Sequence, residues 1–414
     1  ECGAQPFVEI GMMPRVYASE DITLFQYKDN ISMPKHMDEW NDLIQKFVTF
    51  LLNRYGLEEI RQWYFEVWNE PDIPNFFAGE MDDYFELYAN TAKTVKNIDS
   101  ELKIGGPATS KSKWIKEFKD YCDTNEVPLD FISTHHYPGD ALGHSFDKEK
   151  HIKKIKRIMD NDYDSLLDVT REILYNEDKI KDYPSNLLKD NAARVSKIAE
   201  DIPVYYTEWN GTSTTVATVN DTEYNAAYVV KTCLETDSII DGSSYWTFSD
   251  IFEELAYFTD PFYGGFGLLT IDGIKKPNYY AFKFLNELGE KTYTLVGNED
   301  HLHISLFKGE SDLKLMITNQ NFDFNSNDVI DYEIELENCL SEVVEEKRIN
   351  STDSNSYYQW KELGSPKPLT KEQIKLIREK SKEAIYKTTH KNMDNKLLIE
   401  GTIKVNEVKV ITIK

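Results

Sequence analysis

The sequence predicts an α/β protein in which a parallel sheet precedes a smaller antiparallel β-sandwich. Two observations carry this prediction. Strand-like and helix-like segments alternate up to about residue 290, which is the pattern of a parallel sheet with helical crossovers. Beyond that point, short segments of alternating apolar and polar residues are separated by turn-forming residues, as in a β-sandwich. We therefore divide the chain into a domain of residues 1–290 and an accessory domain of residues 291–414.

The elements of the first domain follow from their apolar spacing. Gln5 to Ile10 is a short apolar run that predicts a buried strand close to the first residue. The further predicted elements are helices over Asp38–Tyr55 and Tyr84–Ile98 and strands over Trp63–Trp68, Lys103–Gly106, Phe131–His135, Val204–Thr207 and Ser244–Phe248. The charged stretch Asp140–Glu200 is too long for a plain loop, and it is either a cover over a site or a solvated helical insert.

The elements of the second domain are mostly strands with a period of two residues. They are predicted over His301–Phe307, Leu313–Asn319, Val329–Leu336 and Lys396–Ile413, with one helix over Lys371–Ala384.

Composition and charge exclude several function classes. The chain has 414 residues, 40% of them hydrophobic, and no apolar run long enough to span a bilayer. Its net charge of −25 repels nucleic-acid phosphates and anionic lipids, so neither nucleic acid nor membrane is an expected partner. The four cysteines fit neither a zinc site nor a disulfide framework, which predicts a reducing, cytoplasmic location and no metal.

Two carboxylates that end apolar, aromatic strands are the strongest functional signal. Glu70 lies in YFEVWNEPD and Glu208 lies in VYYTEWN. Because the carboxyl ends of parallel strands in a β/α barrel face one mouth, both side chains can converge there. Two convergent carboxylates are what glycoside hydrolysis requires, whereas each one alone could be a surface acid or a helix cap.

These motifs, taken together, resemble glycoside hydrolase family 39. Trp68–Pro71 and Thr207–Asn210 are similar to the acid/base and nucleophile strands of retaining glycosidases built on (β/α)₈ barrels. Further matches are Pro6–Pro14, Gly105–Pro107, Ser133–Pro138, Asp221–Thr222, Asn225–Tyr228, Phe248–Glu254, Gly264–Leu268 and Lys276–Pro277. The resemblance covers nearly the whole chain and implies a (β/α)₈ barrel followed by the β-sandwich of family β-xylosidases.

The resemblance also implies roles for individual residues. Glu70 would be the general acid/base on the fourth barrel strand and Glu208 the nucleophile on the seventh, with no cofactor. Asn69 would bond the sugar 2-hydroxyl, or it is a turn-former before proline. Other expected substrate-binding residues are His135, His136, Tyr137, Trp246 and Glu9, each of which could instead be a core residue. Because neighbouring strand residues face opposite sides, His135 and His136 cannot both point into the mouth of a regular strand.

The chain departs from the family pattern in three places. Phe76–Phe77 stands where family β-xylosidases commonly have a Trp, and Asn220 stands where a His precedes the Asp-Thr pair. Matched to the family, Pro6–Ile10 would be the third barrel strand, so the first two strands are absent. A six-stranded remnant would expose two sheet edges, and we expect another segment, covalent or not, to complete the barrel.

The leading hypothesis is a retaining, exo-acting β-D-xylosidase that releases xylose from short xylo-oligosaccharides. An α-L-iduronidase is the alternative within enzymes, although a chain at −25 would repel its carboxylated substrate. A different class is a carbohydrate-sensing module of a larger protein, for example a transcriptional regulator. The sequence leaves the oligomeric state open, and a homo-oligomer is compatible with it.

Overall fold

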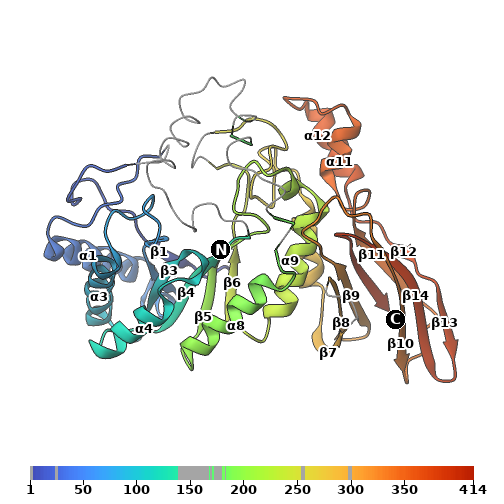
Figure 1. Cartoon of the computed structure of the whole chain (residues 1–414), viewed down its shortest axis with the longest axis horizontal. Coiled ribbons are helices and arrows are strands. Elements are labelled where there is room, and N and C mark those ends of the chain that lie inside the picture. Colours follow the sequence, from blue (N-terminus) through green and yellow to red (C-terminus); the bar gives the residue numbers. More distant parts are fainter. Residues whose placement is uncertain are drawn as a thin grey trace.

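The computed structural model describes residues 3–23, 27–138, 167, 170–171, 180–181, 183–252, 257–296 and 301–414. A parallel sheet with its helices lies beside two antiparallel sheets, and the carboxyl terminus is in the antiparallel part (Figure 1). The predicted fold class is confirmed. Most of the Asp140–Glu200 stretch lies outside the described residues, as do Glu253 and Glu254 from the family motifs.

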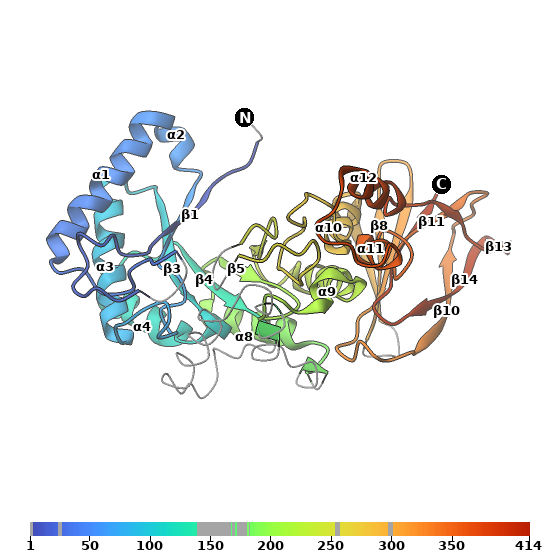
Figure 2. The same ribbon diagram turned by 90° about the horizontal axis from the view of Figure 1, so that it is seen from above.

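The parallel sheet contains six strands in sequential order, and each strand is parallel to its neighbour. The strands curl into a half-barrel whose outer side carries the helices (Figure 2). The strands are β1 (Phe7–Ile10), β2 (Tyr64–Val67), β3 (Lys103–Thr109), β4 (Phe131–His136), β5 (Val204–Trp209) and β6 (Gly242–Tyr245). Most of their bounds lie within one or two residues of the predicted segments; β3 ends three residues later than predicted, and β6 ends three residues earlier.

Of the helices of this part, those at Asp38–Tyr55 and Tyr84–Ile98 were predicted from their apolar spacing, and the others were not. The helices are α1 (Met37–Tyr55), α2 (Leu57–Ile60), α3 (Met81–Ile98), α4 (Ile115–Thr124), α8 (Leu187–Ala199), α9 (Glu223–Thr236) and α10 (Pro277–Asn286), with short 3₁₀ turns η1 (Ser110–Ser112) and η2 (Thr218–Asp221). In α1 the buried residues Trp40, Ile44, Val48 and Leu51 recur every three or four positions, so one face of this helix is buried. Gly56 ends this helix at a φ of 89°.

The interior of the half-barrel is layered. Near the amino ends of the strands, the rings of Phe7, Tyr64, Phe131 and Tyr205 form one aromatic cluster with centroid separations of 5.0 to 5.7 Å. Because inward positions recur every second residue, the next layer toward the carboxyl ends contains Glu9, Glu66, Ser133 and Thr207. The layer above it contains the site described below.

The antiparallel part consists of a six-stranded sheet, ordered β12-β11-β15-β9-β8-β7, and a three-stranded sheet, ordered β10-β14-β13. Both sheets enclose a core that consists mainly of Ile, Leu and Val side chains. The strands are β7 (Glu290–Val296), β8 (Leu302–Lys308), β9 (Leu313–Asn319), β10 (Val329–Glu337), β11 (Val344–Ile349), β12 (Tyr386–Lys387), β13 (His390–Met393), β14 (Lys396–Lys404) and β15 (Val408–Ile413).

Two expectations for this part are wrong. Lys396–Ile413 is not one strand, because a turn that contains Asn406 at a φ of 56° separates β14 from β15, and these strands belong to different sheets. Two helices, not one, interrupt the strands: α11 (Ser356–Glu362) and α12 (Lys371–Lys380). The second is shorter than predicted and begins at a capping box formed by Thr370 and Gln373.

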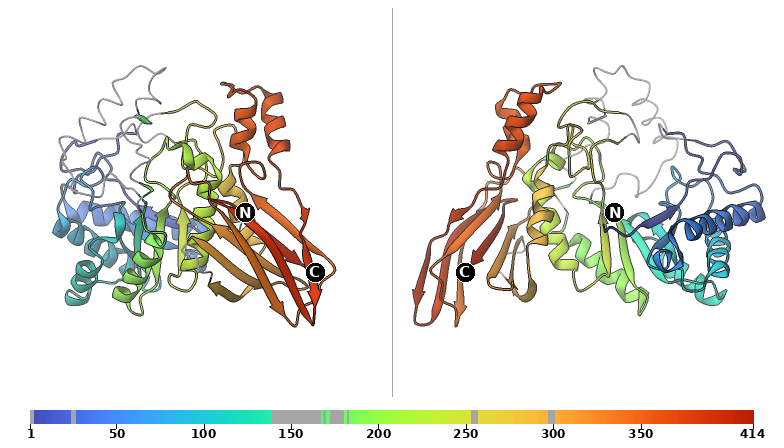
Figure 3. Two further views of the ribbon diagram at one scale, coloured as in Figure 1. Left: turned by 45° about the vertical axis from the view of Figure 1, so that its right-hand side comes forward. Right: turned by 180° about the vertical axis from the view of Figure 1, so that it is seen from behind.

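The two parts share an apolar core. Met316, Val408 and Val410 of the six-stranded sheet belong to the same buried cluster as α9 and α10. The α11–α12 pair stands at the side of the sandwich that faces the barrel loops (Figure 3), where Trp360 and Ile377 pack with Phe262 and Ile274. Among the described residues, no helix combines the length and the apolar character that a membrane span needs.

Candidate active site

A cavity of about 290 Å³ lies at the carboxyl ends of the parallel strands. Glu70, which follows β2, and Glu208, near the end of β5, both face it. The lining residues are Glu9, Gly11, Met12, Tyr27, Asp29, Asn69, Glu70, Phe76, Tyr137, Glu208, Ser213, Trp246, Phe252 and Phe266.

The two glutamates meet at one histidine. His135 Nδ1 lies 2.9 Å from Glu70 Oε1 and 3.6 Å from Glu208 Oε2, and the His135 side chain is fully buried. The ligand atoms of all three residues lie within 4.8 Å of one another. Tyr137 donates a hydrogen bond of 2.7 Å to Glu208 Oε2. Glu208 is therefore contacted by two side chains, His135 and Tyr137, that both come from the end of β4.

The backbone around Glu70 adopts a conformation that few side chains tolerate. Trp68 has a φ of 70° and Glu70 a φ of 43°, both at positive values that favour glycine. The amide of Glu70 donates a 2.9 Å hydrogen bond to the carbonyl of Ala108, which holds this turn against β3. Non-glycine residues in this region cost about 1–3 kcal/mol each and gather at functional sites.

The two neighbouring histidines diverge, as the alternation of strand residues requires. His135 faces the glutamates, whereas His136 Nδ1 lies 3.1 Å from Asn191 Nδ2 on α8. Burial, with the charge of Lys111, lowers the pKa of His136 to about 3, so its ring is neutral. The structure does not bring His136 to the cavity, in contrast to the expectation that it binds substrate.

The other expected binding residues lie where the sequence places them. Asn69, Tyr137, Trp246 and Glu9 line the cavity. Asn69 Oδ1 is buried and has no hydrogen-bond partner among the described residues, so it is an acceptor that a ligand in the cavity can satisfy.

Glu9 carries an additional carboxylate into the cavity. Glu9 is partly exposed to solvent and lies on β1, an edge strand of the half-barrel. The surrounding protein nevertheless desolvates the carboxyl group and raises its pKa well above the usual range, and the charges of Glu66, Glu208 and Glu70 act in the same direction.

Several residues in or beneath the cavity were not predicted from the sequence. Tyr27 and Asp29 come from the loop after β1, and their position beyond a strand end was an available signal. Phe76, which departs from the family pattern, lines the cavity, whereas Ser213 carries no pattern of its own. Glu66, which is 3% exposed, lies inside β2 and was missed because a strand interior predicts packing.

The tryptophans that flank the glutamates belong to the core rather than to the cavity wall. Trp68 is fully buried and its Nε1 donates to the carbonyl of Phe76. Trp209 packs against Tyr228, Tyr245 and Phe282. Both tryptophans therefore serve core packing.

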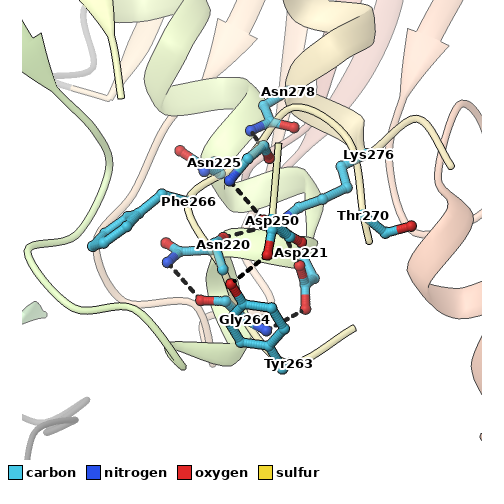
Figure 4. A network of polar contacts seen from close by, with 12 residues as sticks. Asn220, Asp221, Asn225, Asp250, Tyr263, Gly264, Phe266, Thr270, Lys276 and Asn278 are labelled. Atoms are coloured by element: carbon cyan, nitrogen blue, oxygen red, sulfur yellow. Dashed lines mark hydrogen bonds and ion pairs between the residues drawn. The ribbon is translucent and has the colours of Figure 1, made fainter. Parts of the chain in front are cut away.

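A buried ion cluster fastens the loops behind the cavity. Lys276 Nζ lies 2.6 Å from Asp221 Oδ1 and 3.1 Å from Asp250 Oδ2, and all three side chains are fully buried (Figure 4). The backbone amides of Gly264 and Gly267 donate to Asp221 and Asp250, respectively. The cluster thus ties together η2, the segment after β6 and the residue before α10.

The ionisation of this cluster follows from its burial. Desolvation raises the pKa of Asp250 to about 6 although Lys276 opposes the shift, and it also raises the pKa of Asp221. Desolvation alone would lower the pKa of Lys276, but the two carboxylates outweigh it and the pKa is raised. The lysine therefore stays charged between two acids.

Among the described residues, Glu70, His135 and Glu208 are also the group whose donor atoms lie close enough to hold a metal ion. The same three side chains include the acid pair expected for glycoside hydrolysis, which needs no metal. We therefore assign no metal to this group.

The sequence matches the family described as "Glycosyl hydrolases family 39" over residues 1–162 and 150–395. The chain belongs to glycoside hydrolase family 39. It is 38% identical to a β-xylosidase of Caldicellulosiruptor saccharolyticus over 428 aligned positions, which cover all of this chain and 80% of that protein. It is 30% identical to a β-xylosidase of Geobacillus stearothermophilus, over 99% of this chain and 77% of that protein.

Solved structures give the same result. A monomeric β-xylosidase from Caulobacter crescentus superposes with a TM-score of 0.76 at 28% identity, over all of this chain and 81% of that one. A bacterial orthologue of human α-L-iduronidase superposes with a TM-score of 0.63 at 17% identity, over 99% of this chain and 69% of that one, and shares the fold. The family assignment makes this chain a glycosidase that hydrolyses O-glycosyl bonds.

Proposed function

We propose that the chain is a retaining, exo-acting β-D-xylosidase in which Glu70 is the acid/base and Glu208 the nucleophile. Its substrates are short xylo-oligosaccharides. The observation that carries the proposal is the spacing of the two carboxylates, which have oxygens within 4.8 Å of each other. Retaining glycosidases hold their carboxyl groups about 5–5.5 Å apart, whereas inverting ones need about 6.5–9.5 Å to admit a water molecule.

The reaction proceeds in two displacements. Glu70 transfers its proton to the glycosidic oxygen while a Glu208 oxygen attacks the anomeric carbon, so the bond to the leaving alcohol breaks and a glycosyl ester forms. Glu70, now ionised, then takes a proton from water, whose oxygen attacks the same carbon and releases Glu208. The Tyr137 hydroxyl donates a hydrogen bond to Oε2 of Glu208 and so helps to orient this carboxylate toward the anomeric carbon.

The charge of the cavity supports a neutral sugar. Its described lining contains Glu9, Asp29, Glu70 and Glu208 and neither Lys nor Arg. A uronic acid would bring a fifth carboxylate into this group without a cation to pair with it. The α-L-iduronidase alternative therefore receives no support from the geometry. A cavity of about 290 Å³ lies at the small end of ligand pockets, which favours a short, terminal sugar.

The test is hydrolysis of a panel of 4-nitrophenyl glycosides by the wild type and by Glu208→Ala, Glu70→Ala and Glu117→Ala. Glu117 is an exposed glutamate on α4 and serves as the matched control. We expect the β-D-xyloside to be cleaved best and Glu208→Ala to lose at least about 10⁴-fold in kcat, with Glu117→Ala unchanged. Proton NMR of the first product should show the β-anomer.

The exo mode is tested with xylotetraose, from which xylose should be the first product. Early release of xylobiose would contradict the exo assignment, and an initial α-anomer would contradict retention. A folded wild type that cleaves no glycoside but binds xylo-oligosaccharides in calorimetry would instead favour the carbohydrate-sensing alternative.

We also propose that further strands complete the barrel between β1 and β6. Both strands are edges of the described parallel sheet, and an uncovered edge is open to pairing. The chain spans about four-fifths of the length of the relatives that it matches. Amide hydrogen exchange tests the proposal: slow exchange of the outward amides of Gly242–Tyr245 indicates a covering segment or a second copy, and fast exchange contradicts both.

A further inference from the structure

The strand that carries the proposed nucleophile contains a bulge immediately before it. Between β4 and β5, Thr134 pairs with Tyr206 and His135 pairs with Glu208, so Thr207 has no partner on β4. The ladder with β6 on the other side is irregular at the same place. A β-bulge adds one residue to a strand and turns the following side chains to the opposite face.

The bulge decides which side chain enters the cavity. Tyr205 lies in the aromatic layer inside the half-barrel, and Thr207 points inward one layer above it. Regular alternation would then turn Glu208 outward and Trp209 inward. The observed arrangement is the reverse, because Glu208 lines the cavity and Trp209 packs on the outer side against Tyr228. Without the bulge, the carboxylate would leave the site.

One hydrogen bond pins this bulge from across the barrel. Thr207 Oγ1 donates to Glu66 Oε1 at 2.7 Å. Glu66 lies on β2, and β3 and β4 separate that strand from β5, so the bond spans the interior rather than joining neighbours. It links the strand that leads to Glu70 with the strand that holds Glu208, one layer below the two carboxylates.

The carboxylate of Glu66 is costly to bury, which argues that it does more than fill space. Its side chain is 3% exposed, and desolvation raises its pKa. The charge of His135 and the hydroxyls of Ser133 and Thr207 oppose this shift. Among the described residues, no Lys or Arg contributes to this shift. An apolar side chain of similar size would be easier to bury here.

We propose that Glu66 is a positioning residue that fixes the bulge at Thr207 and thereby aims Glu208 at the anomeric carbon. The proposal rests on the proposed function, because it assigns a role to a residue beneath the proposed nucleophile. Glu208 is then held twice: by Tyr137 at its carboxylate and by Glu66 through the backbone of the preceding residue.

The experiment compares Thr207→Val, Glu66→Met and the double variant on two aryl β-D-xylosides, with 4-nitrophenol and the better leaving group 2,4-dinitrophenol. Each variant removes the hydrogen bond between Thr207 and Glu66. Glu66→Met also removes the buried charge, so this variant is expected to fold. We expect each single variant to lose on the order of 10- to 100-fold in kcat, with KM within about threefold of wild type. The double variant should lose no more than the larger single loss, since both changes break one bond.

The two substrates separate a nucleophile defect from an acid defect. Attack by Glu208 is needed with either leaving group, so the loss in the Thr207 and Glu66 variants should persist with 2,4-dinitrophenyl xyloside. Glu70→Ala should recover most of its kcat/KM with that substrate, because kcat/KM reports the first displacement and a good leaving group needs little protonation there. Thr207→Ser and Glu66→Gln keep a donor and an acceptor, respectively, and should restore kcat to within about threefold of wild type.

Thr91→Val is the matched control, because Thr91 is fully buried and accepts a 2.8 Å hydrogen bond from Trp40 outside the barrel. It should lower the melting temperature and leave kcat unchanged. Thr207→Val or Glu66→Met with wild-type kcat and a similar fall in melting temperature would overturn the proposal. A wild type that cleaves neither xyloside would instead overturn the proposed function, which is a separate result.

Discussion

Replacing Lys276 with methionine should destabilise the protein strongly and in a way that depends on pH. Coulomb's law with an effective dielectric constant of about 20 gives ~6 kcal/mol for the 2.6 Å contact with Asp221 and ~5 kcal/mol for the 3.1 Å contact with Asp250. Desolvation of the lysine offsets much of this attraction. Removal of one partner from a buried ion cluster costs about 3–5 kcal/mol, which is the loss in the free energy of unfolding that we expect near pH 8.

The loss should shrink on acidification. Desolvation already raises the pKa of Asp250 to about 6, and without the lysine the pKa values of Asp221 and Asp250 rise further. The folded variant then binds protons that the unfolded chain releases above a pKa of about 3.9. Stability of the variant therefore rises as the pH falls toward that value, by up to about 1.4 kcal/mol per pH unit and carboxyl group.

The assay is urea unfolding followed by tryptophan fluorescence at pH 8 and pH 5.5. The control is Lys46→Met, which removes an exposed ion pair with Asp42 and should not shift the unfolding midpoint measurably at either pH. The difference between wild type and Lys276→Met should be smaller at pH 5.5. Two results would refute the conclusion that the charge of Lys276 stabilises this cluster. One is an equal difference at both pH values, and the other is a loss in the free energy of unfolding below about 1 kcal/mol at pH 8.

Three further predictions concern the site and the strand beneath it. Tyr137→Phe removes the 2.7 Å hydrogen bond to Glu208, so steady-state kinetics should show kcat about 10- to 100-fold lower with a nearly unchanged KM, and an unchanged kcat would contradict this role. Trp246→Ala should raise KM for xylobiose several-fold, because it removes an aromatic wall of the cavity. The control Phe248→Ala, at a side chain that is 70% exposed, should leave KM unchanged. Equal KM values for both variants would refute the role of Trp246. His136→Asn should make the free energy of unfolding fall less steeply as the pH is lowered. Burial lowers the pKa of His136 to about 3, so below about pH 6.5 the unfolded chain binds a proton that the folded chain does not. Wild type therefore loses up to about 1.4 kcal/mol per pH unit in this range. Urea midpoints at pH 7.5 and 4.5 test this, and parallel curves for wild type and variant would contradict it.

The sequence was sufficient to predict the six parallel strands and two of the helices, because their signals are local. The apolar spacing of Asp38–Tyr55 locates α1 to within one residue, since helix packing repeats every three or four positions. The two glutamates could be brought together by a general rule, because carboxyl ends of parallel strands share one mouth. His135 and His136 could be told apart in direction for the same reason: alternation is a local property of a strand.

The β-sandwich was harder to predict, because the wrong predictions concern segments in which no local sequence signal is strong. The turn at Asn406 separates β14 from β15, but apolar and polar residues continue to alternate on both sides of it, so a single long strand was predicted. The helix α11 has seven residues, and its burial against Phe262 of the barrel loops stabilises it, rather than any periodicity of its own.

The nucleophile strand combines both situations. From Val204 onward the alternation of β5 predicts Glu208 on the outer face, and the prediction that it reaches the cavity rests on its place at a strand end and on resemblance rather than on periodicity. What reconciles the two is one inserted position, Thr207, whose partner is 141 residues away on a strand that is not a neighbour. No window of local sequence contains both residues of that hydrogen bond. The sequence feature that indicates this hydrogen bond is an acidic residue inside an apolar strand, such as Glu66. Regular strand alternation sometimes places a strand-end carboxylate on the face opposite to its site, and a bulge then has to turn it inward. An inward-facing acid one layer below is therefore a candidate for the residue that holds such a bulge.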